Sequence, residues 1–455
     1  MSAYQLVWLR QDLRTFDHSA LHHAMAAGPT LAVVVLSPEQ WRLHDDAPIK
    51  IDFYLRQLQA LQSDLANLNV PLLVLRVELW HDIANALKKL CQTLPIANLY
   101  ANREAGVNEI SRDKWVTQSL KQLNINSHFF EDRTLFALGS IRNKSLQPYQ
   151  VFSAFKKQCY EKLSVSLAPC YPTPQAQQML DLNFDQSMLN IPSLTELGFN
   201  QIPPLQQALW PVGENSAFDR LDAFIADQVA YYDRERDYPH LNSTSQLSAY
   251  LNIGMLSIRS CVNALFREQY GNFDFVSTGQ QVWLNELLWR EFYQHILFDF
   301  PKVSKHQPFK DTTKGLMWCD APDELHAWQQ GQTGIPIVDA GIRQMLATGW
   351  MHNRVRMIVA MFLSKNLLID WRLGETWFMQ HLIDGDLAAN NGGWQWCAST
   401  GTDAVPYFRI FNPVSQSEKF DPNGDYLRCW LPELAHLNAK EIHDPYAKHP
   451  QRKLD

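Results

Sequence analysis

The sequence predicts an α/β N-terminal domain, built on a five-stranded, parallel, doubly wound and Rossmann-like sheet, followed by an all-helical domain. Two observations predict this division. Strand-like and helix-like stretches alternate over the first 130 residues, which is typical of a parallel sheet covered by helices. After about residue 215 the strand patterns stop, and only apolar repeats at helical spacing remain. At 455 residues, the chain is long enough for two such domains.

Each strand of the first domain is predicted by a short apolar run, because a strand covered on both faces is apolar at nearly every position. Such runs lie at residues 6–9, 31–36, 71–76, 97–101 and 127–130. Apolar residues at helical spacing predict the intervening helices at residues 17–27, 51–68, 83–90 and 107–120. Neither a GxGxxG nor a GxxxxGKS/T pattern occurs, which excludes the dinucleotide fingerprint and the P-loop.

A proline-rich connection, with one helical stretch at residues 151–163, separates the two predicted domains. Helical patterns then follow at residues 218–233, 257–270, 279–298, 337–347, 351–366 and 375–382. We therefore expect an α/β domain at residues 1–131, a linker at residues 132–212 and a helical domain at residues 213–455.

The amino-acid composition limits the cellular compartments and the classes of binding partner that are expected for the chain. The formal net charge of -7 argues against broad electrostatic attachment to nucleic acid or membrane, but it leaves room for a local basic groove. The seven cysteines form no CxxC pair, which is typical of a reduced, cytoplasmic chain without disulfides or structural zinc. The N-terminus lacks the apolar region of a signal peptide. The longest apolar runs, such as residues 357–363, are too short to span a bilayer.

The most informative stretch is DGDLAANNGGWQW at residues 384–396. It combines two carboxylates, two amides, a glycine pair and two tryptophans. Buried carboxylates and amides need hydrogen-bond partners, and adjacent tryptophans offer flat surfaces that stack on other rings. Polar groups beside aromatic walls indicate a pocket for a planar heterocycle. The alternative is a glycine-rich turn between core helices.

Two helical stretches carry further candidate residues. Trp283, Glu286 and Arg290 fall at i, i+3 and i+7, so they share one helix face that could line a polar cavity. The alternative is an ordinary buried face with a paired glutamate and arginine. Asn353 and Met357 stand at i and i+4, and an amide beside a thioether suits contact with a neutral ring. Core packing explains Met357 equally well.

Residues 231–248 end with four hydroxyls in six positions, shortly before a helical pattern begins. Hydroxyls and free backbone N–H groups at a helix start can hold phosphate oxygens, and the alternative is a helix cap and loop. His18 and His22 lie one helical turn apart, but no third ligand or HExxH pattern accompanies them, so we expect no metal site. These residues predict a large aromatic cofactor carrying phosphate, and they do not name a reaction.

Nearly the whole chain resembles the photolyase and cryptochrome family, and most closely the bacterial class I cyclobutane pyrimidine dimer photolyases of the folate type. The matching motifs are long and specific. They are LVWLRQDLR at residues 6–14, TSQLS at 244–248, WLNELLWREFY at 283–293, GWMHNRVRM at 349–357 and IDGDLAANNGGWQW at 383–396.

The resemblance implies a U-shaped FAD held without a covalent bond in the helical domain. The protein would position and tune this cofactor. The matching positions are Tyr232, Thr244, Ser245, Gln246, Leu247, Ser248, Trp283, Glu286, Arg290, Asn353, Arg356, Asp384, Gly385, Asp386 and Asn390. Among them, Asn390 would meet the flavin N5, and Arg356 with Asp384 would form a charge pair beside the ring. Gln246 departs from relatives that carry arginine there, which removes one charged phosphate contact.

The resemblance also implies an enzyme, a carbon–carbon lyase, that uses light to repair UV-damaged DNA. Excited FADH⁻ would pass an electron to a pyrimidine dimer that has been flipped out of the duplex. The implied catalytic residues are Glu286, Asn353, Met357 and Asn390. The implied DNA- and lesion-binding residues are Glu286 again, the stacking walls Trp289 and Trp396, and the phosphate-binding residues Arg236, Arg354 and Arg409.

Two further sets follow from matching positions. Trp394, Trp371 and Trp318 match a tryptophan relay that reduces the oxidised flavin under light. His44, Asn108, Glu109 and Lys305 match positions that hold a 5,10-methenyltetrahydrofolate antenna. We expect a monomer that does not bind membranes.

A competing hypothesis is a cryptochrome-type blue-light receptor with the same flavin fold but no repair activity. Repair of (6-4) lesions uses a histidine pair in the stretch that here carries Asn353, so that activity is not expected. A flavin-binding structural module would leave Trp289, Trp396 and Glu286 without a role.

Overall fold

The computed structural model describes residues 3–404 and 406–446. It divides into two compact units. Unit 1 comprises Met1–Ala226, Gln246–Val276 and Leu284–Pro301, and unit 2 comprises Asp227–Ser245, Ser277–Trp283 and Lys302–Asp455. The two units are described separately below, and the domain boundaries at residues 131 and 212 stay a prediction.

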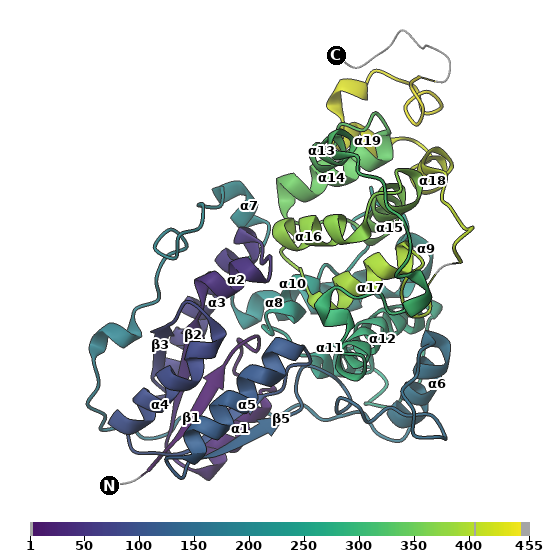
Figure 1. Cartoon of the computed structure of the whole chain (residues 1–455). Helices are drawn as coiled ribbons and strands as arrows, with labels where there is room; N and C mark the ends of the chain where they lie inside the picture. The colour runs from purple at the N-terminus through teal and green to yellow at the C-terminus, as the bar shows by residue number, and fades with distance from the viewer. Residues whose placement is uncertain (1–2, 405, 447–455) are drawn as a thin grey trace. The chain divides into compact units, whose positions relative to one another are not determined.

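Unit 1 contains the predicted five-stranded parallel sheet (Figure 1). Its strands are β1 (Tyr4–Leu9), β2 (Thr30–Leu36), β3 (Leu72–Arg76), β4 (Ile96–Asn102) and β5 (Asn126–Phe130). They are ordered β3-β2-β1-β4-β5, and every adjacent pair is parallel. The predicted fold class of this region is confirmed. The strand order reverses between β1 and β4, which makes their carboxyl ends the topological switch point of the sheet.

Helices connect the strands as the sequence predicts. They are α1 (Ser19–Ala27), α3 (Pro48–Asn67), α4 (Ile83–Thr93) and α5 (Val107–Lys121), with the short α2 (Pro38–Leu43) and the 3₁₀ turn η1 (Trp80–Asp82) in addition. Leu6, Trp8, Leu31 and Val33 share one hydrophobic cluster with the apolar faces of α4 and α5. Alternate strand residues thus face these two helices, which lie together over the sheet in Figure 1.

The rest of unit 1 is mainly irregular or helical. It holds α6 (Phe152–Leu163), the 3₁₀ turn η2 (Gln186–Leu189), α7 (Pro204–Ala208), α8 (Glu214–Asp227), α10 (Ser248–Asn252), α11 (Ile258–Leu265) and the second part of α12 (Thr278–Asp299). No strand follows β5 among the residues described, as the sequence predicts.

A buried ionic cluster ties the helix α11 to the loops that follow β1 and β5. Arg259 on α11 donates to both carboxylate oxygens of Asp17 at 3.0 Å and to Asp132 at 2.9 Å, and Arg14 also pairs with Asp132. All four side chains are at most 7% exposed. Burial alone would raise the pKa of the Asp132 carboxyl, but Arg14 and Arg259 outweigh burial and hold that pKa below its usual range. This cluster joins distant segments of unit 1.

The regular elements of unit 2 are all helical among the residues described. Its elements are η3 (Val229–Tyr231), α9 (Tyr232–Glu235), the first turns of α12, η4 (Val303–Lys305), η5 (Asp311–Thr313), α13 (Pro322–Gln330), α14 (Pro336–Thr348), α15 (Asn353–Met361), the π-helix η6 (Phe362–Asn366), α16 (Trp371–His381), α17 (Leu387–Cys397), α18 (Pro413–Phe420), α19 (Asp425–Trp430) and η7 (Pro432–Leu434). One hydrophobic cluster contains buried residues from α13 to α17 and α19. Within the described ranges, no helix is both long and apolar enough to cross a membrane.

Several predicted helix boundaries were wrong in detail. The stretch predicted at 218–233 is two helices, because α8 ends at Asp227 and the turn η3 precedes α9. The stretch predicted at 257–270 ends at Leu265, and Tyr270 has a positive φ of 53° that no helix accommodates. The stretch predicted at 351–366 begins only at Asn353, because His352 caps that helix.

Candidate functional site

The most informative stretch of the sequence folds as a helix. Asp386 caps the helix α17, and its side chain accepts a hydrogen bond from the backbone N–H of Ala389 at 2.9 Å. The glycine pair therefore lies inside a helix, and the alternative of a glycine-rich turn was wrong. The helix α17 presents Asn390, Trp394 and Trp396 from one short rigid segment.

The structure pairs Arg356 with Asp384. The Nη2 atom of Arg356 lies 3.0 and 2.9 Å from the two carboxylate oxygens of Asp384, which is 9% exposed. The Nε–H of the same guanidinium donates to the carbonyl of Met351 at 2.7 Å. These contacts hold the Arg356 guanidinium in one orientation near the start of α15.

Asn390 is oriented by a backbone carbonyl of α16. Its Nδ2 atom lies 3.0 Å from the carbonyl oxygen of Glu375. A carbonyl can only accept, so the amide nitrogen must face it and the oxygen Oδ1 must face the other way. The buried Glu375 carboxylate accepts from Asn391 at 2.8 Å, and Asn391 in turn accepts from Gln395 at 2.8 Å. This network holds α16 and α17 in one relative position.

Asp237 links two of the predicted phosphate-binding arginines. Arg354 contacts an oxygen of Asp237 at 2.7 Å, and Arg236 approaches the same carboxylate at 3.7 Å. Arg354 also lies 3.8 Å from the sulfur of Met357 and 4.5 Å from the ring centre of Phe420. No local pattern in the sequence indicates this role of Asp237, because Arg354 lies more than a hundred residues away.

Trp289 has an aromatic partner that the sequence did not reveal. In unit 1 its ring stacks on Phe152 of α6, with centroids 3.6 Å apart and planes inclined by 11°. Arg290, the next residue, donates to the carbonyl of Arg133 at 2.8 Å.

Gln246 adopts a positive φ of 49° and accepts a hydrogen bond from Arg220 at 2.9 Å. A guanidinium from α8 is therefore hydrogen-bonded to the side chain that replaces the expected arginine.

The three tryptophans of the predicted relay belong to the core of unit 2. Trp394 and Trp371 are buried in one hydrophobic cluster, and Trp318 is partly buried against it. The ring of Trp394 packs edge-on against Phe378 at 4.9 Å. Gly374 makes this packing feasible, since a Cβ atom there would lie 2.1 Å from the Trp394 ring.

Two of the predicted antenna residues of unit 1, His44 and Asn108, are hydrogen-bonded to each other. The side-chain amides of Asn108 and Gln40 approach Nε2 of His44 at 2.9 and 3.0 Å. Burial lowers the pKa of His44, which favours the neutral ring at pH 7. Burial, reinforced by the nearby Glu104 carboxylate, raises the pKa of Glu109 to about 7.

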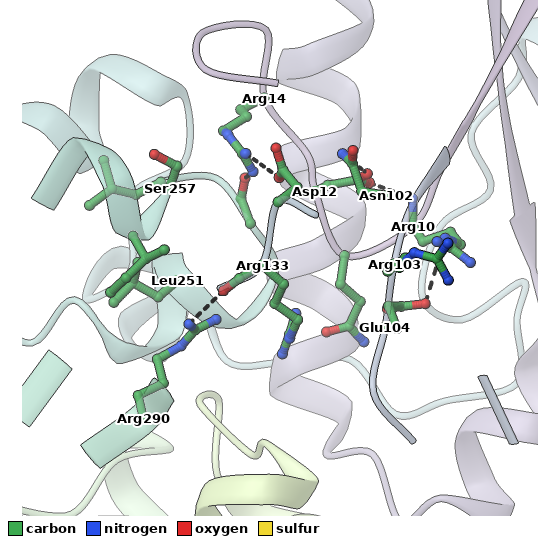
Figure 2. Close-up of a pocket in the computed structure, with 15 residues that line it drawn as sticks. Arg10, Asp12, Arg14, Asn102, Arg103, Glu104, Arg133, Leu251, Ser257 and Arg290 are labelled. Carbon is green, nitrogen blue, oxygen red and sulfur yellow. Dashed lines mark hydrogen bonds and ion pairs between the residues drawn. The ribbon is translucent and has the colours of Figure 1, made fainter. Parts of the chain in front are cut away.

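Figure 2 shows a pocket of unit 1 at the switch point of the sheet. Asp12 follows β1 and Asn102 ends β4, and the Asn102 amide donates to the Asp12 carboxylate at 2.8 Å. Parallel α/β sheets commonly bind ligands at this edge. The cavity measures about 20 Å³, which is room for water but not for a folate or a flavin. Arg290 is the one predicted flavin residue that lines this pocket.

The predicted flavin residues are divided between the two units. Unit 1 carries Gln246, Leu247, Ser248, Glu286 and Arg290. Unit 2 carries Tyr232, Thr244, Ser245, Trp283, Asn353, Arg356, Asp384, Gly385, Asp386 and Asn390. Of the antenna set, Lys305 lies in unit 2 and the other three residues lie in unit 1.

Comparison with known proteins identifies the family. Residues 5–176 match the family model described as DNA photolyase, and residues 283–455 match the one described as the FAD binding domain of DNA photolyase. The deoxyribodipyrimidine photo-lyase of Vibrio cholerae is 43% identical, with 97% of this chain and 93% of the relative covered. The enzyme of that name from Escherichia coli is 42% identical, with 97% and 91% covered.

Solved structures agree with the sequence comparison. A class III photolyase from Agrobacterium tumefaciens superposes with a TM-score of 0.85 at 33% identity, covering 98% of this chain and 90% of that one. A cryptochrome from Synechocystis superposes with a TM-score of 0.86 at 30% identity, covering 98% and 92%. Both the sequence and the fold show that this chain belongs to the DNA photolyase family.

Proposed function

We propose that the protein repairs cyclobutane pyrimidine dimers in DNA when it absorbs blue light. When bound and reduced, FAD supplies the light-excited electron that splits the dimer and afterwards recovers that electron. The observation that carries this proposal is the orientation of Asn390, whose amide nitrogen is committed to the carbonyl of Glu375. The amide oxygen then remains as an acceptor, which suits a ring N–H and not a ring nitrogen that itself accepts.

Asn390, Arg356 and Asp384 of unit 2 fit a reduced flavin. The N5 position of a reduced flavin carries a hydrogen, so it can donate to the oxygen of Asn390. The Arg356–Asp384 pair places a fixed guanidinium on the helix α15, where it can stabilise a negatively charged ring. We assign the phosphates and ribose to Tyr232 and residues 244–248. Trp283, Glu286, Arg290, Asn353, Gly385 and Asp386 complete the proposed flavin set.

The proposed lesion site uses the remaining predicted residues. Trp289 and Trp396 would stack on the flipped dimer, while Glu286, Asn353 and Met357 would contact its polar edge. Stacking by Trp289 is supported by its partner Phe152, which holds the indole ring flat on one side. A lesion that is already poorly stacked costs less to extrude than an intact base pair.

We propose that arginines bind the DNA backbone. The proposed cellular location follows from the composition of the chain. Arg236, Arg354 and Arg409 would contact phosphates, which makes binding weaken with salt. We propose that the protein acts as a monomer in the cytoplasm. The likeness to a cryptochrome keeps a blue-light receptor as the competing function, and one repair assay distinguishes the two.

A reduced, FAD-loaded sample should remove thymine dimers from an oligonucleotide under blue light and not in the dark. Dimer loss can be counted by chromatography of the digested oligonucleotide. With Glu286→Ala, the number of dimers repaired per absorbed photon at saturating DNA should fall by at least about 2-fold, because a polar contact to the lesion is lost. No repair by the loaded wild-type protein would favour the receptor, and an unchanged yield in the variant would remove Glu286 from the lesion site.

Folate binding should weaken as the pH falls below 7. Burial and Glu104 raise the pKa of Glu109 to about 7, so the carboxylate that can accept from a pterin N–H is lost on the acid side. The affinity at pH 6 should be about 10-fold lower than the plateau reached above pH 8, if only the ionised form binds. The near-ultraviolet folate band, followed in a titration at each pH, measures this change.

Glu109→Gln is the control for the folate experiment. A glutamine does not ionise between pH 6 and 8, so its folate affinity should be flat over that range. Burial lowers the pKa of His44, so the neighbouring imidazole titrates at a lower pH than a free one. An equal pH dependence in Glu109→Gln would show that another group titrates.

A further inference from the structure

A buried lysine of unit 2 binds the backbone of a surface turn. The ammonium of Lys365 donates to the carbonyl oxygens of Pro406 at 3.2 Å, Tyr407 at 3.4 Å and Arg409 at 3.0 Å. The lysine is 7% exposed. An ammonium group has three N–H donors, so these carbonyls use its full capacity.

The burial of this charge requires those carbonyls. Taking an ammonium out of water costs several kcal/mol unless hydrogen bonds replace the lost hydration. Burial lowers the pKa of Lys365, and the nearby Arg409 and Lys310 add to that effect. Among the residues that the structure describes, no carboxylate forms an ion pair with Lys365. Its stabilising partners are therefore the carbonyls of the turn.

The aromatic side chains of the turn are exposed to solvent. The backbone N–H of Arg409 donates to the carbonyl of Pro406 at 3.0 Å, which closes a four-residue turn. Tyr407 and Phe408 are 62% and 85% exposed, and Ile410 is 53% exposed. While its carbonyls bind Lys365, the turn leaves two aromatic rings exposed to solvent, and the Arg409 guanidinium lies 5.9 Å from the ring centre of the neighbouring Phe411. This combination is suited to unstacked bases and a phosphate backbone.

Lys365 also lies on a segment that is continuous with the proposed lesion site. The helix α15 carries Asn353 and Met357, and it runs without a break into the π-helix η6, which contains Lys365. Single π-helical turns inside α-helices are frequent at functional sites. One helical segment therefore bears both the lesion contacts and the anchor of the turn.

We infer that Lys365 is a positioning residue for DNA binding, which fixes the turn 406–409 so that Tyr407, Phe408 and Arg409 meet the damaged strand. This inference rests on the proposed function. Lys365 does not touch the cofactor or the dimer in this role. Its removal should loosen the turn and weaken the affinity for DNA, while the chemistry at the flavin continues.

The test compares Lys365→Met with Lys314→Met. Methionine keeps the length of the side chain but removes all three donors. Lys314 is a matched control in the same unit, because its side chain is 53% exposed and pairs with Asp311 at the surface. Three quantities are measured on FAD-loaded protein: the Kd for an oligonucleotide with one thymine dimer, the repair rate at saturating DNA, and the rate of tryptic cleavage after Arg409.

In Lys365→Met we expect the Kd to rise about 10-fold, because three carbonyls of the turn lose the lysine as their donor and the turn loosens. Cleavage after Arg409 should accelerate by a similar factor, while the repair rate at saturating DNA should stay within about 2-fold. Lys314→Met should match the wild type in all three. A folded, FAD-loaded Lys365→Met with unchanged Kd and unchanged cleavage would overturn the inference.

Two further outcomes keep the inference separate from the proposed function and from folding. If the wild type does not bind dimer-containing DNA, the proposed function and the DNA role both fail, and cleavage after Arg409 still tests the anchor. If Lys365→Met does not fold, hydrogen exchange of the Arg409 amide is measured in the wild type. Slow exchange supports an ordered turn, and exchange at the rate of an unprotected amide overturns the inference.

Discussion

Replacing Arg259 with methionine is expected to lower the free energy of unfolding by about 3–5 kcal/mol, because it leaves buried carboxylates without their partner. Asp17 is fully buried, and it receives two hydrogen bonds at 3.0 Å from the guanidinium. Asp132 would retain only Arg14 as its ionic partner. Urea unfolding, followed by circular dichroism, measures the loss.

Arg267→Met provides the matched control. Arg267 lies shortly after the same helix, but its side chain is 63% exposed and pairs with an exposed Asp222 at 3.2 Å. Exposed pairs of this kind contribute about 0–1 kcal/mol. Equal losses in the two variants would mean that the buried cluster of Arg259 does not stabilise unit 1.

The same cluster makes stability depend on pH. The pKa of Asp132 is held below its usual range by Arg14 and Arg259, which outweigh burial. Because the folded pKa is the lower one, the stabilisation is fully present above the unfolded value of about 3.9 and is lost as the pH falls toward the folded value. Removing Arg259 reduces the depression of that pKa. Acid should therefore cost the Arg259→Met variant less additional stability than the wild type.

The architecture of the first 130 residues could be predicted because local pattern and tertiary environment agree there. A central strand such as β2 is buried on both faces, so its sequence is apolar throughout, as in TLAVVVL. The short α2 was missed, because six residues give too few turns for an apolar repeat. The spacing of apolar residues indicates which positions are buried, but it does not indicate the exact residue at which a helix starts.

Residue patterns indicated a pocket for a planar ring, but individual roles were predicted only where family motifs marked the residues. Gly392 and Gly393 favour a turn by propensity, yet the helix α17 continues through them, because capping and packing outweigh the roughly 1 kcal/mol cost of each glycine. Asp237, Phe152 and Lys365 act through partners far away in the sequence, and no local pattern encodes such contacts. Lys365 had one weak signal, a single charge after an apolar run.

Trp394→Phe is expected to slow the light-driven reduction of oxidised FAD by about 10-fold or more, because phenylalanine is much harder to oxidise than tryptophan. Trp394 lies one turn after Asn390 on the helix α17, so the two side chains share a face. The residue proposed to meet the flavin thus has the first relay tryptophan as its neighbour. Absorbance of the oxidised flavin under blue light, with an external reductant, measures the rate.

Trp328→Phe removes the same volume from the same cluster and is the matched control. Trp328 is fully buried and packs edge-on against Trp394 at 6.0 Å, so both variants lose core packing. Only Trp394→Phe should lose photoreduction, and both should repair dimers normally once the flavin is reduced chemically. If photoreduction slows equally in Trp328→Phe, the slower photoreduction in Trp394→Phe results from lost core packing.

Gly374→Ala tests the placement of the same ring from its neighbouring helix. A methyl group there would lie 2.1 Å from the Trp394 ring and 2.7 Å from Leu363, so the ring or the helix α16 must shift. Such overpacking costs about 1–3 kcal/mol. Because the shifted ring changes the electron path as well as the core, photoreduction should slow although every tryptophan is retained. Normal photoreduction in a destabilised Gly374→Ala would show that the relay tolerates movement of Trp394.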